Sequence, residues 1–314
     1  MYAAPRNIQT QIFATLPEEL RFRNRTSRLS KFVEGDFDSF LEGPSFDRLG
    51  NLYCVDLAFA RIFCVDTNGK FHVVAEYDGA PNGLKIHRDG RIFVADRQHG
   101  IIVINPATKR IQHILERYDL EPFKGPNDLV FSPAGDLYFT DQGMSDLINA
   151  TGRVFRLRAD GRLDLLLDKL PSPYGIALDP SGRVLYVALT RANSIIKVPV
   201  LPDGRLSRVL NFIQLSGGGG PDGIAVDSEG GLAVAHPLLG AVWLFDGRGQ
   251  PTLRVNLCRG VLGTNVAYGG PDGRRLYITE AETGTIQVAD VPINGSAMFS
   301  HADGVAAHEG TQLT

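Results

Sequence analysis

Oxygen-bearing side chains recur at one position of a repeated phrase, and they are of the types that bind hard metal ions. The phrase runs roughly P-x-G, three apolar residues, D-P-x-G, then L-Y and apolar residues up to an acid. The variable residue of the six copies is, in order, Glu42, Asn82, Asn127, Tyr174, Asp222 and Thr264. Carboxylate and amide oxygens that converge suit Ca²⁺, Mg²⁺ or Mn²⁺. Carboxylates close together repel each other, and a divalent cation removes that conflict.

The spacing of the copies predicts the fold that brings these side chains together. Successive variable residues lie between 40 residues (Glu42 to Asn82) and 48 residues (Tyr174 to Asp222) apart. Repeats of this length built from short β-rich runs are typical of a β-propeller. We therefore expect an all-β fold, a six-bladed β-propeller with four-stranded antiparallel blades around a central channel.

Each copy also predicts a hairpin whose two open ends lie on one face of the ring. A first apolar run, a D-x-x-G turn and a second run form two antiparallel strands. The second run ends at an acid or histidine in five copies. These residues are Asp56, Asp96, Asp141, His236 and Glu280. An acid here could serve the site or only cap the strand end, and both readings stay open.

We expect one domain over residues 1–314. Residues 1–28 form an N-terminal extension that packs on the ring, about 29–293 hold the six blades, and 294–314 form a loosely ordered tail. The sixth blade lacks a fourth strand after GTIQVADV. We expect the stretch around Leu29–Val33 to supply it.

Composition excludes several classes of protein. The net charge of −3 gives no reason to expect nucleic acid or an anionic membrane as partner. No apolar run is long enough to span a bilayer, and the N-terminus lacks the pattern of a secretory signal. The three cysteines are few, which favours a reducing, cytoplasmic location. The oligomeric state stays open.

Several of the phrases resemble one known family. EGPSFD, PNGLKIH, GPNDLVFSPAGDLYFTD, GGPDGIAVD and GTNVAYGGPDGRRLYITE are similar to the senescence marker protein (regucalcin), gluconolactonase and luciferin-regenerating enzyme family over about residues 15–290. The resemblance implies a divalent cation in the channel, Ca²⁺ first, with Zn²⁺, Mn²⁺, Mg²⁺ or Fe²⁺ as alternatives. It places the metal ligands on Glu42, Asn127, Asp222 and the fourth-blade position. It also implies a hydrolase that opens a small-molecule lactone by attack of a metal-activated water.

The chain departs from the family at the fourth blade, where Tyr174 replaces the usual Asn. The phenol could bind a harder ion as phenolate, could orient substrate while water fills the vacancy, or could mark lost activity. We favour the second. The candidate catalytic residues are then Asp222, His236 and Tyr174, with His236 as a proton carrier. The candidate substrate-binding residues are Asn82, Tyr174, Asp96 and His99.

Three other functions remain as alternatives. One is a phosphotriesterase-like hydrolase, and another is a propeller that binds calcium or a ligand with altered or lost catalysis because of Tyr174. A quinone-dependent sugar dehydrogenase fits less well, because the single tryptophan, Trp243, lies in an ordinary strand run.

Overall fold

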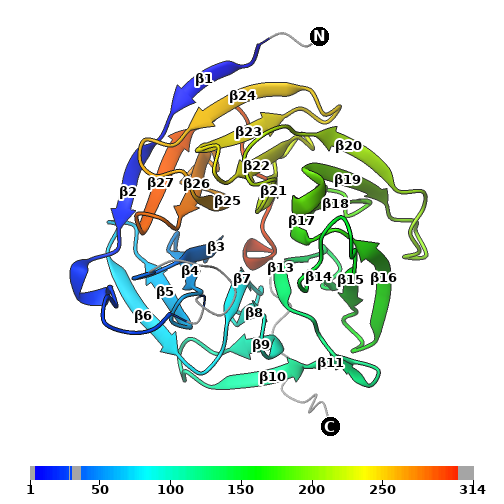
Figure 1. Ribbon diagram of the computed structural model, residues 1–314, viewed down its shortest axis with the longest axis horizontal. Helices are drawn as coiled ribbons and strands as arrows, with labels where there is room; N and C mark the ends of the chain where they lie inside the picture. The colour runs from blue at the N-terminus through cyan, green and yellow to red at the C-terminus, as the bar shows by residue number, and fades with distance from the viewer. Residues whose placement is uncertain (1–3, 28, 30–36, 303–314) are drawn as a thin grey trace.

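The computed structural model describes residues 4–27, 29 and 37–302, and it confirms the predicted propeller. Six sheets, five of four strands and one of five, are arranged around a central channel (Figure 1). The described elements are strands and short 3₁₀ helices. No helix in this part of the chain is long and apolar enough to cross a bilayer.

The blades follow one another along the chain, and each places its first strand innermost. The strands of the first three blades, from the channel outward, are β3 (Leu41–Phe46), β4 (Leu52–Asp56), β5 (Arg61–Val65) and β6 (Phe71–Glu76); β7 (Pro81–Ile86), β8 (Ile92–Asp96), β9 (Gly100–Ile104) and β10 (Ile111–Leu115); and β13 (Pro126–Phe131), β14 (Leu137–Asp141), β15 (Gly152–Leu157) and β16 (Leu163–Leu170). A two-stranded ribbon, β11 (Arg117–Tyr118) and β12 (Glu121–Pro122), joins the second blade to the third.

The other three blades repeat the pattern, and the N-terminal strands are added to two of them. Their strands are β17 (Pro173–Leu178), β18 (Val184–Leu189), β19 (Ser194–Pro199) and β20 (Leu210–Gln214); β21 (Ile224–Val226), β22 (Leu232–His236), β23 (Ala241–Phe245), β24 (Pro251–Asn256) and β1 (Arg6–Gln9); and β25 (Gly263–Gly269), β26 (Arg275–Glu280), β27 (Thr285–Asp290) and β2 (Gln11–Thr15).

The strand that closes the ring differs from the prediction. β2 pairs antiparallel with β27 and supplies the fourth strand of the sixth blade. Leu29 instead packs beside Phe59 and Ala80 on the first two blades, and residues 30–33 lie outside the described residues. β2 alternates in burial, with Ala14 buried and Thr15 exposed, as an outer strand of a blade requires. The closure thus uses a segment that we expected only to cover the ring.

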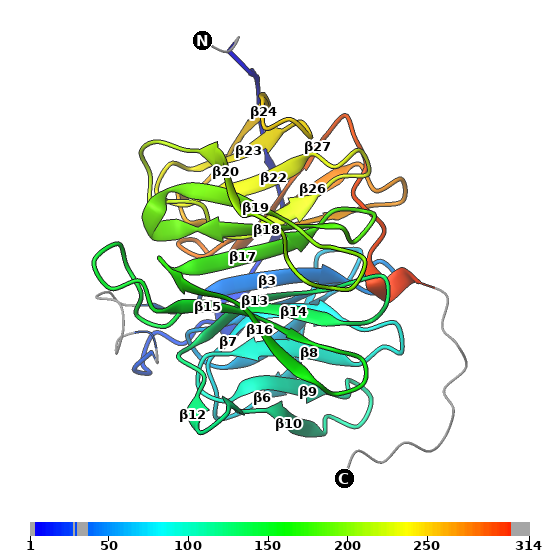
Figure 2. The same cartoon turned by 90° about the vertical axis from the view of Figure 1, so that its right-hand side faces the viewer.

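The first part of the predicted tail, up to residue 302, contacts the blades. Gly295 pairs with Asp227 of the fifth blade. The 3₁₀ helix η4 (Phe299–His301) follows, and the Phe299 ring stacks on Phe131 with centroids 4.8 Å apart. The segment from 303 onward lies outside the described residues. In Figure 2, η4 and the loop between β14 and β15 lie at opposite ends of the channel axis, so η4 lies at the mouth opposite that loop.

The core lies between neighbouring blades. Aliphatic and aromatic side chains from the faces of adjacent sheets form six buried clusters. Burial of these side chains removes apolar surface from water, which is the main favourable term in folding. The blades are therefore held rigidly, and the inner strands have fixed positions around the channel.

Candidate functional site

The inner strands are packed so closely that the residues they begin with form one ring. They contact one another in the order β3, β7, β13, β17, β21, β25 and back to β3. Gly43 explains the approach, because a Cβ there would lie 2.6 Å from the backbone oxygen of Asn82. A Cβ on Gly175 would likewise lie 2.3 Å from the backbone oxygen of Asp222. Glycine after the variable residue thus brings neighbouring ring positions together.

Hydrogen bonds from side chains to backbone oxygens join two further pairs of neighbouring blades at the level of the ring. The Thr140 hydroxyl donates to the backbone oxygen of Tyr174 at 2.7 Å and links the third blade to the fourth. The Thr264 hydroxyl donates to the backbone oxygen of Leu41 at 2.8 Å and links the sixth blade to the first. Thr264 therefore serves the scaffold of the ring.

The strands also change register at the ring. In five inner strands the pairing with the second strand shifts at or directly after the variable residue, as between Glu42 and Ser45 or between Pro126 and Leu129. A β-bulge bends the strand and re-aims a side chain. The shared irregularity explains how one position in each blade can present its side chain at the channel mouth.

The structure brings the predicted metal ligands together. Glu42, Asn82 and Asn127 are the second residues of their inner strands, and Asp222 lies just before β21. All four are buried, and Asp222 is the most exposed of them at 9%. Burial raises the pKa of Glu42 to about 8, and the charge of Asp128 adds to the shift. Burial and the charges of Glu42 and Asp128 raise the pKa of Asp222 well above its usual range.

These oxygens fit a hard divalent cation. Among the described residues the buried Asn82 Oδ1 atom has no hydrogen-bond partner, which is costly unless another ligand contacts it. Glu42 accepts from the Gly43 amide at 2.7 Å and from Asn265 at 3.2 Å, both through Oε2. Its Oε1 atom keeps its lone pairs for another partner. The described residues contain no cluster of three or more His, Cys, Asp or Glu side chains suited to a metal, so a cation here would also need the amide oxygens.

Asp128 is a charged residue of the site that the sequence analysis missed. Its side chain is 1% exposed, Oδ1 lies 3.8 Å from the Lys85 ammonium, and Oδ2 has no partner within the part of the chain that the structure describes. It acts on both Glu42 and Asp222 through its charge. A signal was present, because the residue after the ring position is glycine in four blades but Asp128 and Asn265 in the other two.

Tyr174 lies at the ring as predicted, beside both carboxylates and two cations. Burial raises the pKa of its phenol, Asp222 adds to the shift, and Arg97 and Arg191 oppose it. The phenol is therefore neutral near pH 7. A neutral hydroxyl is a hydrogen-bond donor and acceptor, and it is a weaker metal ligand than the amide oxygen of asparagine.

The strand-end acids hold the backbone together instead of facing the ring. Asp96 is fully buried, and its oxygens accept from the amides of Ala80, Gln98 and His99 and from the Tyr77 hydroxyl. With its lone pairs used in this way, Asp96 has no oxygen to offer a substrate. The structure thus favours the strand-cap reading of Asp96.

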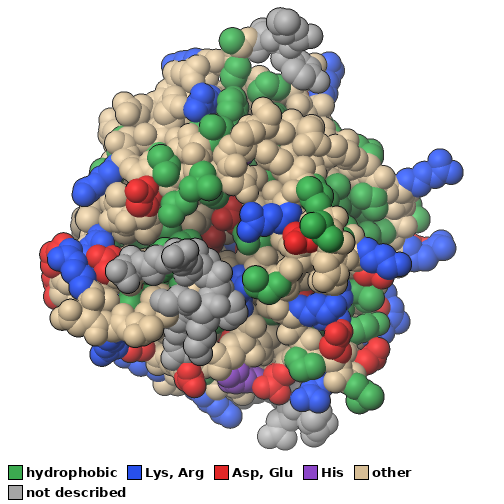
Figure 3. Space-filling view, viewed as in Figure 1, with side chains coloured by type: hydrophobic (Ala, Val, Ile, Leu, Met, Phe, Trp, Pro, Cys, Tyr) green, Lys and Arg blue, Asp and Glu red, His purple; other side chains and the backbone are tan. Residues whose placement is uncertain are grey.

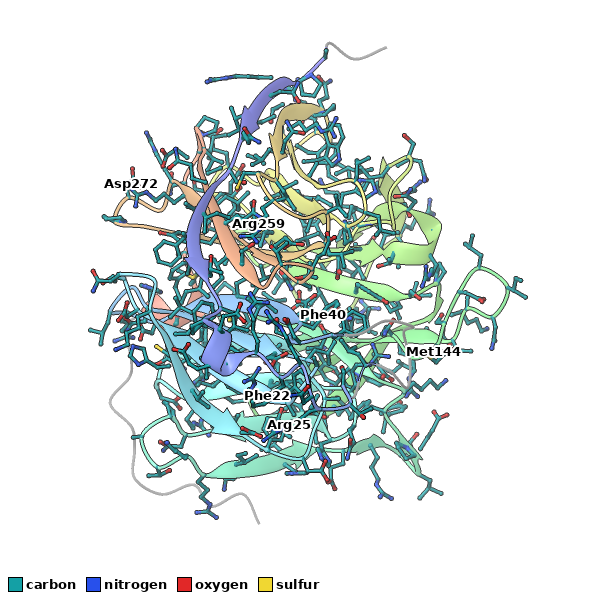
Figure 4. All side chains as sticks on the ribbon, turned by 60° about the vertical axis from the view of Figure 1, so that its left-hand side comes forward. Phe22, Arg25, Phe40, Met144, Arg259 and Asp272 are labelled. Atoms are coloured by element: carbon teal, nitrogen blue, oxygen red, sulfur yellow. The ribbon has the colours of Figure 1, made fainter. Side chains whose placement is uncertain are left out.

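Asp56 and Asp141 follow the same pattern with an arginine added. Asp56 accepts from the Phe40 amide at 2.8 Å and from the Arg61 guanidinium at 2.5 Å. Arg61 in turn lies 4.2 Å below the centroid of Phe22. Arg25 contacts the same Phe22 ring at 4.0 Å, and Figure 4 shows these two side chains next to each other. These contacts hold the N-terminal segment that contains Phe22 and Arg25 against the first blade.

His99 and His236 each bond to a backbone carbonyl oxygen. His99 bonds through Nε2 to the backbone oxygen of Asp78, and its ring lies 4.7 Å from that of His113 on the outermost strand of its blade. His236 is 1% exposed and bonds through Nε2 to the backbone oxygen of Gly217 at 3.0 Å. Burial lowers its pKa, so it is neutral. Both bonds go to backbone oxygens, and the catalytic role of His236 and the substrate-binding role of His99 stay predictions.

The loops of the same face surround the mouth with apolar side chains. Met144, Leu147 and Ile148 lie on the loop between β14 and β15 and are 73%, 69% and 97% exposed. Leu238 follows β22 and Val261 precedes β25, and both are also exposed. In the space-filling view of this face, hydrophobic side chains gather around its centre (Figure 3). We call these five residues the apolar rim.

Known proteins resemble the chain in sequence and in fold. Gluconolactonase of Zymomonas mobilis is 35% identical over 217 residues, which cover 63% of this chain and 60% of that protein. Lactonase drp35 of Staphylococcus aureus is 29% identical over 292 residues, which cover 87% of this chain and 86% of that protein. Regucalcin of Agrobacterium tumefaciens, a calcium-binding protein of solved structure, superimposes with a TM-score of 0.75 at 22% identity, covering 94% of this chain and 98% of that one.

A family profile also matches most of the chain. The profile described as the SMP-30/Gluconolactonase/LRE-like region matches residues 40–282, from just before the first inner strand to just after the last second strand. All six ring positions fall inside this range. The chain belongs to the SMP-30/gluconolactonase/LRE-like family.

Proposed function

We propose that the protein is a metal-dependent lactone hydrolase whose site is the ring of inner-strand residues. The observation that carries the proposal is the convergence of Glu42, Asn82, Asn127 and Asp222, two buried acids and two amides, at one channel mouth. The relatives named gluconolactonase and lactonase support the reaction class. The calcium-binding relative supports a divalent cation and Ca²⁺ as the first ion to test.

In this proposal Glu42, Asn127 and Asp222 hold the cation, with Asn82 as a further oxygen donor or as a contact to substrate. When bound, the cation would supply Lewis-acid polarisation of the ester carbonyl and would lower the pKa of a water. Asp222 would then accept a proton from the attacking water. The neutral Tyr174 hydroxyl would donate a hydrogen bond to an oxygen of the lactone.

The apolar rim favours lactones that carry a hydrocarbon substituent over bare sugar lactones. Loops at the mouth of a propeller set selectivity on a rigid scaffold. When a substrate chain covers exposed apolar groups close to a site, binding becomes more favourable by roughly 25 cal/mol per Å² of apolar surface buried. A lactone with an alkyl chain would place its ring at the carboxylates and its chain against Met144 and Leu147.

The test is acid release from a panel of sugar lactones and alkyl lactones. Protein stripped with a chelator is compared with the same protein given back Ca²⁺, Zn²⁺, Mn²⁺, Mg²⁺ or Fe²⁺ singly. Hydrolysis that returns with a metal supports the proposal, and hydrolysis that survives stripping contradicts its metal dependence. Metal binding without turnover of any lactone would instead support the binding propeller. Turnover of phosphotriesters alone would support the phosphotriesterase-like alternative.

A further inference from the structure

Gln142 lies between the ring and a half-buried cation, in a place that the proposed reaction has not yet used. It directly follows Asp141 at the end of β14, and its side chain is 3% exposed. On one side lies the Arg97 guanidinium and on the other the Tyr174 hydroxyl. The three residues come from the second, third and fourth blades, so the contact depends on the closed ring.

Only one orientation of the Gln142 amide satisfies both neighbours. Its oxygen then accepts from Nη1 of Arg97 and from Nη2 at 3.1 Å, while its nitrogen donates to the Tyr174 hydroxyl at 3.2 Å. The opposite orientation would set the amide NH₂ group against a guanidinium, which has donors only. Arg97 therefore fixes the polarity of the amide.

The orientation of the Gln142 amide determines the direction in which the Tyr174 hydroxyl can donate its hydrogen. Because the phenol oxygen accepts from Gln142, its own hydrogen must point elsewhere. No acceptor for this hydrogen is found among residues 4–27, 29 and 37–302. The charged groups that act on Tyr174 are Asp222, Glu42, Arg97 and Arg191, which places the phenol at the channel mouth beside the proposed ligands.

We propose that Gln142 and Arg97 are positioning residues that direct the Tyr174 hydroxyl as a hydrogen-bond donor to the oxygen of the lactone on which negative charge develops. This inference rests on the proposed function. It also accounts for the departure at the fourth blade, since an asparagine would offer the cation an oxygen whereas Tyr174 offers the substrate a proton donor. No proton has to leave the phenol in this role, so no further reactant is needed.

The sharpest test reverses the hydrogen bond without changing its shape. In Gln142→Glu the new carboxylate still pairs with Arg97 but can only accept from Tyr174, so the phenol hydrogen turns toward residue 142. We expect kcat of the metal-restored protein to fall about 10²-fold, as for loss of one oxyanion donor, and KM to change little. Tyr174→Phe should lose the same amount, and Tyr174→Phe combined with Gln142→Glu should lose no more than either alone.

Gln98→Glu is the matched control, because it adds the same charge to an exposed side chain next to Arg97. We expect it to keep the wild-type kcat. If Gln142 only fills space, Gln142→Glu will keep its kcat because the pair with Arg97 remains, and the inference is overturned. Thermal unfolding of each variant confirms that a loss of kcat does not come from loss of the fold.

A second readout separates this inference from the proposed reaction. δ-Valerolactam, an uncleaved analogue, is titrated into the metal-restored protein by calorimetry. If the wild type opens no lactone yet binds the lactam, and both Tyr174→Phe and Gln142→Glu weaken binding equally, the reaction fails and the donor role stands. Lactam binding that neither variant changes, or a wild type that neither opens lactones nor binds the lactam, overturns the donor role.

Discussion

The Asn265 amide donates to Oε2 of Glu42 at 3.2 Å across the junction between the last blade and the first. The backbone amide of Val266 donates to Oδ1 of the same Asn265 side chain at 2.8 Å. Asn265 is thus held in one orientation, and it holds in turn the acid that begins the first inner strand. The closure of the ring and the geometry of the proposed metal ligand are therefore one structural feature.

Asn265→Ala should destabilise the protein and weaken its metal site together. A buried hydrogen bond contributes about 1 kcal/mol, and leaving a buried oxygen of Glu42 unpaired costs about 1–3 kcal/mol, so the free energy of unfolding should fall by about 1–3 kcal/mol. Urea unfolding and calcium titration measure the two effects. Asn211→Ala, which removes an exposed amide bonded to Gln214, serves as control and should cost less than about 0.5 kcal/mol. An Asn265→Ala protein as stable as the control would contradict this account of the junction.

Gly43→Ala should be far more harmful than Gly90→Ala, although both glycines have positive φ, +57° and +87°. The added Cβ at Gly43 meets the Asn82 backbone oxygen at 2.6 Å, whereas nothing lies within 4 Å of a Cβ at Gly90. The left-handed strain is common to both, so the difference reports the close approach of the inner strands. We expect Gly43→Ala to lower the free energy of unfolding, measured in urea, by ~1–3 kcal/mol more than Gly90→Ala does. Equal costs would show that the inner strands can move apart freely.

Metal affinity should rise with pH until about pH 8. Burial raises the pKa of Glu42 to about 8 and that of Asp222 well above its usual range, so in the metal-free protein both acids keep their protons to a higher pH than free carboxyls do. A cation must displace these protons, and each proton released changes affinity by about tenfold per pH unit. The sign is fixed, because a raised carboxyl pKa disfavours the ionised form that binds metal. Calcium calorimetry between pH 5.5 and pH 8.5 tests this, and an affinity independent of pH would contradict it.

The apolar rim should affect one class of substrate only. Ile148→Ser and Leu147→Ser remove exposed apolar surface from the mouth and should raise KM for lactones with an alkyl chain several-fold. KM for unsubstituted δ-valerolactone should stay constant. Leu120→Ser, a matched change at a 93% exposed leucine on the ribbon between the second and third blades, should alter neither value. If Ile148→Ser raises KM for both substrates alike, the rim acts on the whole site and does not select for the chain.

The repeat allowed the ring to be predicted because six copies of one backbone place equivalent residues at equivalent positions. Glu42, Asn127 and Asp222 could therefore be grouped without knowledge of any distance. The closing strand could not be assigned, because pairing of Gln11–Thr15 with β27 joins the two ends of the chain and leaves no local pattern. The role of Asp96 could not be predicted, because it depends on whether a substrate or nearby backbone amides bond to its oxygens. In the structure the amides do. Gln142 escaped notice because its role needs Arg97 and Tyr174 from two other blades.

The most direct test of the central claim is the rate of lactone opening by chelator-stripped protein before and after addition of Ca²⁺, in wild type, Asp222→Asn and Asp203→Asn. Asp203 is an exposed turn residue paired with Arg205, so it controls for the chemistry of the substitution. The account predicts that Ca²⁺ restores hydrolysis to wild type and Asp203→Asn and leaves Asp222→Asn at least about 10²-fold slower. Hydrolysis by the stripped protein, or by Asp222→Asn at the wild-type rate, would contradict it.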